Sequence, residues 1–219
     1  MNKRHFRFSR VAFSRIMRDE VFYIFTDQQL RMLIEGKVIG DSFPYDRSDE
    51  EETLAHINRL FYRINRIYNV VCEAEWNHFG SGYASFVEFF CYWKKDCIVV
   101  EEINRMREIE IRGILLDISR LAPVAIMGED VRYKTIRIET NEEVTSGHGS
   151  ILDTPISLIV GKELKTLAAE LQNALEEFDY KRLTANEMST PLSFKTKIPT
   201  TYRNEHQYLV LNAIFYWED

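Results

Sequence analysis

The chain has 219 residues, of which 45% are hydrophobic, and it carries a formal net charge of −6. This apolar content predicts a folded protein with a buried core, arranged as one domain over residues 1–219, and argues against disorder. The acidic balance argues against nucleic acid as a partner, because such binding requires an excess of Lys and Arg on one face.

Neither a membrane span nor a secretion signal is expected. No run approaches the ~20 apolar residues of a spanning helix. The basic start of the chain lacks the apolar stretch of a signal peptide. Three cysteines without a metal-type spacing favour a reduced, cytoplasmic protein.

The first elements expected are strand and helix in that order. Residues 4–15 alternate aromatic and basic side chains, which predicts one strand or two short ones. Thr26 with Gln29 three positions later forms a capping-box pattern for a helix over Asp27–Glu35. Gly36 is expected to end that helix.

The clearest helix signal begins at Ser48, which we expect to cap a helix running to about residue 71. Glu51 stands three residues after the cap, and the acidic first turn suits the positive end of the helix dipole. The apolar residues behind it recur every three or four positions, as in a helix with one buried face. They are Leu54, Ile57, Leu60, Phe61, Ile64, Ile67, Tyr68 and Val71.

Two strands are expected after this helix. Cys72–Trp76 is short, and Tyr83–Trp93 is rich in aromatic residues, which favour strands. Lys94, Lys95 and Asp96 then form a turn. The charged segment Glu101–Arg107 predicts a short helix or a loop.

The densest apolar stretch, Glu108–Asp130, predicts the middle of the sheet. Its near-continuous apolar run is typical of a strand covered on both faces. Pro123 has no amide donor and cannot lie inside a paired strand, so we expect two strands joined at Leu121–Pro123. Gly128 is expected to close the second strand with a turn.

Asp117 is the one carboxylate inside the apolar part of this stretch. A buried carboxylate must be paired or hydrogen-bonded. We expect a partner in Arg120 or Arg112, and the alternative is a functional carboxylate at a strand end.

The remaining chain predicts one more strand, one long helix and a final strand. Tyr133–Glu139 alternates as a half-exposed strand near an edge, and Thr140–Ser150 is a polar loop. Gly161–Leu183 has a helical apolar stripe. Asn186–Arg203 is irregular, and Tyr208–Trp217 predicts a terminal strand docked into the sheet.

Together these elements predict an α+β fold. We expect a mixed or mainly antiparallel central sheet, with two long helices, at about residues 48–71 and 161–183, packed on it.

No catalytic or metal-binding motif is complete in the sequence. The five histidines are scattered, and no nucleophile elbow or phosphate-binding loop occurs, so neither a cofactor nor a metal is expected. The best catalytic combination would serve a hydrolase or transferase with a thiolate held by an imidazole. It draws on Cys91 or Cys97, His78 or His148, and Asp117 or Asp153.

Three stretches resemble small bacterial immunity proteins, the antitoxins that neutralise polymorphic or contact-delivered toxins. They are GILLDISRLAPVAIMGED at Gly113–Asp130, the helix at Lys162–Phe178 and the closing AIFYWED at Ala213–Asp219. The resemblance implies an acidic, cytoplasmic, non-enzymatic protein that binds a toxin at or near its active site. It implies no particular binding residues.

Charge alone selects the candidate residues for binding a cognate toxin domain, whose surface we expect to be basic. Acidic side chains gathered on one face would speed association with such a partner and reject nucleic acid. A cysteine- or histidine-dependent enzyme and a scaffolding subunit are the alternatives, and a solvated surface without a partner is equally open. The candidates are Asp46, Asp49, Glu50, Glu129, Asp130, Glu142 and Glu143.

Overall fold

A computed structural model describes residues 24–77 and 82–218. The strand or strands predicted over residues 4–15 lie outside this part of the chain. The helices are α1 (Asp27–Ile34), α2 (Glu50–Ile64), α3 (Lys165–Glu177), α4 (Ala185–Met188) and α5 (Val210–Ile214), with short 3-10 turns η2 (Lys94–Asp96) and η3 (Pro155–Leu158). The strands are β1 (Val70–Glu75), β2 (Tyr83–Ala84), β3 (Phe86–Trp93), β4 (Cys97–Ile103), β5 (Met106–Ser119), β6 (Val124–Arg137), β7 (Glu142–Gly147), β8 (Lys181–Arg182) and β9 (Trp217–Glu218).

The predicted α+β class with a mainly antiparallel sheet is confirmed. Within the described residues, seven strands form one sheet in the order β1-β3-β5-β6-β7, while β4 also pairs with β5 and β8 with β6. The β6–β8 pair is parallel, and the other ladders of this sheet are antiparallel.

The centre of the sheet is a long hairpin formed by β5 and β6. The predicted pair of strands joined near Pro123 is confirmed, but the expected turn at Gly128 is wrong, because β6 continues to Arg137. Gly128 instead allows η3 to lie close to β6, because a Cβ at this position would collide with the backbone carbonyl of Ser157.

β3, η2 and β4 run one after another along the same edge of β5. The two-residue turn at Asn104 and Arg105 has φ angles of 53° and 65°, and it leads directly from β4 into β5. Positive φ at both central residues is the geometry of the twisted hairpin turn. The short helix or loop predicted over Glu101–Arg107 is therefore wrong.

One expectation on this side of the chain is wrong and one is confirmed. Thr140–Ser150, predicted as a polar loop, contains β7, whose residues are all exposed. Tyr133–Glu139, predicted as a half-exposed strand near an edge, belongs mostly to β6, which lies next to the edge strand β7. Strong pairing with β6 overrides the polar composition of β7.

Helices α2 and α3 cover one face of the sheet, as predicted, although both are shorter than 48–71 and 161–183. Their buried residues, such as Ile57, Leu60 and Leu171, pack against Phe89 and Ile114 of the sheet. No helix within residues 24–77 and 82–218 has the length and apolar character needed to cross a membrane.

The start of α2 differs from the expectation by one residue. Asp49, not Ser48, is the N-cap: its carboxylate accepts hydrogen bonds from the amides of Glu51 and Glu52 at 2.9 and 3.1 Å. The N-cap of α1 is Thr26 with its predicted Gln29 partner, so that capping box is confirmed.

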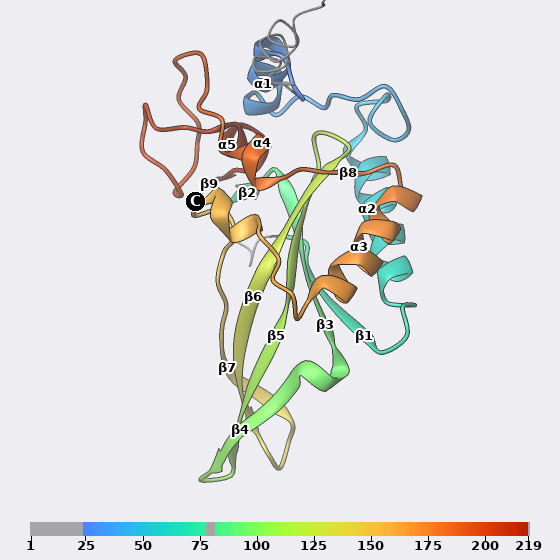
Figure 1. Cartoon of the computed structure of the whole chain (residues 1–219), viewed down its shortest axis with the longest axis vertical. Helices are drawn as coiled ribbons and strands as arrows, with labels where there is room; N and C mark the ends of the chain where they lie inside the picture. The colour runs from blue at the N-terminus through green and yellow to red at the C-terminus, as the bar shows by residue number, and fades with distance from the viewer. Residues whose placement is uncertain (1–23, 78–81, 219) are drawn as a thin grey trace, which may run out of the picture.

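The opposite face of the sheet packs against α1, α4 and α5 over its upper part (Figure 1). The terminal strand expected over Tyr208–Trp217 is wrong in most of its length, because Val210–Ile214 is helical. All five of these residues are buried, including the polar Asn212, so the helix lacks the exposed polar side by which an amphipathic helix is recognised.

The lower part of the sheet projects beyond the helices (Figure 1). We call this part the extension: residues 97–112, which comprise β4 and the first half of β5, and residues 131–147, which comprise the end of β6, the turn after it, and β7. In Figure 1 no α-helix lies beside the extension.

Candidate functional site

The extension carries most of the exposed large hydrophobic side chains. Twelve such residues occur in the described part of the chain, and seven of them lie between residues 97 and 147. Single exposed apolar residues are ordinary, whereas a concentration on adjoining strands marks an interaction surface. The seven are Ile98, Val99, Val100, Ile103, Tyr133, Ile138 and Val144.

The ladders at both edges of the extension are irregular. The β4–β5 register shifts between Val99 and Glu101, and the β6–β7 register shifts between Thr135 and Ile136. Bulges bend an edge and hinder the addition of another strand. The extension therefore offers side chains, more than a regular row of backbone groups, to a partner.

Charges on the extension are largely paired with each other. Glu102 lies 2.6 Å from Arg107, and Glu142 lies 3.0 Å from Arg137. Exposed pairs of this kind stabilise by only about 0–1 kcal/mol, so a partner could separate them at small cost.

The seven acidic residues predicted to bind a partner fall into three separate places. One place is the start of α2, the second is the middle of β6, and the third is the start of β7. The structure thus brings together only residues that are neighbours in sequence. The groups are Asp46, Asp49 and Glu50; Glu129 and Asp130; and Glu142 and Glu143.

Several of these acidic groups have structural partners. Glu50 lies 3.7 Å from Arg120, and Glu143 lies 3.6 Å from Lys134. Glu129 accepts a hydrogen bond from the Gly161 amide at 2.6 Å. Of the seven, Glu142 and Glu143 belong to the extension, beside the exposed apolar residues.

A buried charged cluster lies on the sheet face opposite α2 and α3. Arg132 donates to Glu88 at 2.6 Å and to Asp130 at 3.3 Å, and its guanidinium lies 4.2 Å from the centre of the Phe90 ring. The three charged side chains are at most 12% exposed. Burial strengthens such pairs and makes each partner costly to remove.

Asp117 lies directly opposite Glu88 in the β3–β5 ladder and is 1% exposed. Its Oδ1 has no hydrogen-bond partner among the described residues. Burial first, and the Glu88 carboxyl second, raise the pKa of Asp117 well above its ordinary value, and Arg132 opposes them. Burial also raises the pKa of Glu88, so a proton held by this pair is favoured.

The partner expected for Asp117 is therefore wrong. Arg120 donates to the Trp76 carbonyl, and Arg112 lies 2.5 Å from Glu163. The sequence contains Glu88 within the predicted strand Tyr83–Trp93, but only the strand register shows that it faces Asp117.

A second charged group shows how strongly the sheet curls. Lys134 of β6 donates to both carboxylate oxygens of Glu73 of β1 at 2.9 Å, although β3 and β5 lie between these strands in the sheet. The Tyr92 hydroxyl donates to the same carboxylate at 3.2 Å. The sheet therefore curves so that the Lys134 side chain of β6 reaches β1.

The cysteine–histidine combination is not brought together within the described residues. Cys91 is buried on the face of α2 and α3, with its Sγ 3.2 Å from that of Cys72, while Asp117 lies on the opposite face. Cys97 is exposed at the start of β4. His148 lines a separate hollow with Asp130, and His78 lies outside the described residues.

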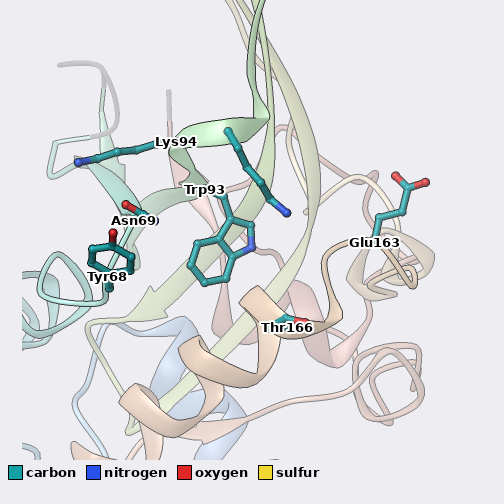
Figure 2. Close-up of a pocket in the computed structure, with 7 residues that line it drawn as sticks. Tyr68, Asn69, Trp93, Lys94, Glu163 and Thr166 are labelled. Carbon is teal, nitrogen blue, oxygen red and sulfur yellow. The ribbon is translucent and has the colours of Figure 1, made fainter.

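An open pocket of about 660 Å³ lies where the end of β3 meets the start of α3 (Figure 2). Figure 2 shows the Trp93 indole between Tyr68 on one side and Thr166 of α3 on the other. Its described lining residues are Tyr68, Asn69, Trp93, Lys94, Lys95, Glu163 and Thr166. Sequence reasoning missed this site, because Tyr68 was expected in the buried stripe of a longer helix.

No group of three or more His, Cys, Asp or Glu side chains that could hold a metal occurs in the described ranges. No protein-family model matches the chain, and the searches of curated proteins and of solved structures return no significant match. Function must therefore be argued from the site itself.

Proposed function

We propose that the chain is a non-enzymatic inhibitor of the immunity-protein kind, which binds and neutralises a cognate toxin domain through the extension. The observation that carries this proposal is the set of seven exposed apolar residues on an uncovered part of the sheet. Exposed apolar side chains concentrated on one part of a protein and bordered by charged residues are typical of a protein-binding site.

The extension also supplies the rim that such an interface needs. Glu142 and Glu143 lie at the start of β7 beside the exposed Val144. Both have Arg or Lys partners, so a basic toxin surface would compete with Arg137 and Lys134 for them. Rim charges of this kind chiefly raise association rates and select the partner.

The test is co-expression with a toxin domain encoded immediately upstream of the gene. We expect protection of the cells and a complex that survives gel filtration. Val99→Lys, which places a charge on β4, should weaken the complex at least tenfold, since a central apolar contact contributes more than about 1.4 kcal/mol.

Tyr62→Lys is the matched control, because Tyr62 is 57% exposed and lies on α2, away from the extension. This variant should protect the cells and bind the toxin domain as well as the native chain does. Absence of any complex with the neighbouring toxin domain, or equal loss in both variants, would refute the proposal.

A further inference from the structure

The pocket of Figure 2 has an aromatic wall formed by Tyr68 and Trp93. Tyr68 is 85% exposed in the turn between α2 and β1, and Trp93 is half-buried at the end of β3. Both residues line the hollow, so each offers part of its ring to a molecule bound there. Exposed aromatic rings beside a cavity offer stacking surfaces for a planar ligand.

The cations at the rim have no partner within the described part of the chain. Lys94 and Lys95 are exposed, and no described carboxylate lies within 4.0 Å of either ammonium group. Glu163 is the one carboxylate among the described lining residues, and Arg112 neutralises it at 2.5 Å. The pocket is therefore locally cationic in a chain whose net charge is −6.

The sequence neighbours of the lining residues carry a net positive charge. Lys162 and Lys165 are exposed neighbours of Glu163 and Thr166, while Asp96, after Lys95, contributes one negative charge. A concave site with clustered cations concentrates anions near it. Together with the aromatic wall, this favours a ligand that combines a flat ring with negative charge.

We propose that this pocket binds a mononucleotide. The base would stack on Tyr68 and Trp93, and the phosphate would bind Lys94 and Lys95. The Asn69 amide and the Thr166 hydroxyl supply hydrogen-bonding groups at the edge of the hollow.

Size and charge both favour a single nucleotide over a longer nucleic acid. The volume of about 660 Å³ lies within the range of roughly 300–1,000 Å³ found for small-molecule pockets. A polymer would place further phosphates over an acidic protein surface, which repels them. This inference does not depend on toxin binding, since none of the lining residues belongs to the extension.

The test is calorimetric titration of the full chain with adenosine, guanosine and uridine monophosphates, each compared with its nucleoside and with inorganic phosphate. We expect saturable binding of at least one nucleotide, and at least about tenfold weaker binding of its nucleoside and of phosphate. Tyr68→Ala should weaken binding about tenfold or more, as loss of one stacking contact does.

The double variant Lys94→Ala with Lys95→Ala should weaken nucleotide binding and reduce its salt dependence. Lys195→Ala with Lys197→Ala removes the same charge at two exposed positions outside the pocket and should change neither. Circular dichroism will verify that each variant is folded. No saturable binding of any nucleotide, equal binding of phosphate alone, or unchanged affinity in the Tyr68 or Lys94/Lys95 variants would overturn the proposal.

Discussion

Glu88 and Asp117 lie directly opposite each other on β3 and β5, with both carboxyl groups buried. Arg132 bonds to Glu88 at 2.6 Å, but one oxygen of Asp117 has no partner in the described chain. Arg132 also pairs with Asp130, so one cation serves three carboxyl groups, and this arrangement makes the stability of the fold depend on pH.

Raising the pH should destabilise the protein through Asp117. Burial raises the pKa of this carboxyl above its ordinary value of 3.8, so the folded chain holds a proton that the unfolded chain has released. This contribution is fully present below about pH 4 and is lost as the pH rises toward the folded pKa. Asp117→Asn cannot ionise, so its stability relative to the native chain should grow with pH.

Urea unfolding of both proteins across a pH series measures this difference. Subtracting the stability of the native chain from that of the variant at each pH removes the contributions of groups that both proteins share. One such group is Glu177, whose pKa is lowered by its hydrogen bond to Arg63, so that its contribution to stability grows with pH. A stability difference that stays constant from acid to neutral pH would contradict the shared-proton arrangement.

Arg132→Met should destabilise the fold strongly. The substitution preserves much of the side-chain length but leaves Glu88 and Asp130 without their cation in a buried site. Removing one partner of a buried pair costs about 3–5 kcal/mol. Arg105→Met is the control: its partner is Glu139 and its side chain is 78% exposed, so thermal unfolding should shift little.

Gly128→Ala should reduce the free energy of unfolding by about 1–3 kcal/mol, because a new methyl group would press on the Ser157 backbone. Gly147→Ala provides a matched control, since no atom lies within 4 Å of a Cβ placed there. Chemical denaturation of the two variants checks the prediction. Equal destabilisation would mean that η3 does not lie close against β6.

Asp49→Ala should destabilise the protein by about 1 kcal/mol through loss of the α2 cap. Ser48→Ala should have a much smaller effect, because no helix amide donates to Ser48. Thermal unfolding distinguishes the two positions. A larger loss in the Ser48 variant would instead support the capping position expected from sequence.

Local signals in the sequence predicted the elements whose residues specify them directly. The Thr26–Gln29 capping box, the aromatic strand ending at Trp93 and the long pair of strands around Pro123 are all present. These features depend on neighbouring residues or on continuous apolar character, which a sequence displays without its partners.

Elements fixed by tertiary contacts could not be predicted in the same way. β7 is polar and exposed, and only pairing with β6 makes it a strand. α5 is buried on every side and has no amphipathic pattern. The Glu88–Asp117 pair required the strand register, and the pocket at Tyr68 required knowing that α2 ends at Ile64.

Because no α-helix covers the extension, its strands should unfold locally before the rest of the sheet. Parting β4 from β5 uncovers less apolar surface than parting β3 from β5, because every residue of β4 is already exposed. Amide hydrogens in β4 and β7 should therefore exchange with solvent through local fraying, while those of β3 await global unfolding. Deuterium uptake along these strands would then report occupancy of the extension, since a bound partner would slow exchange there first.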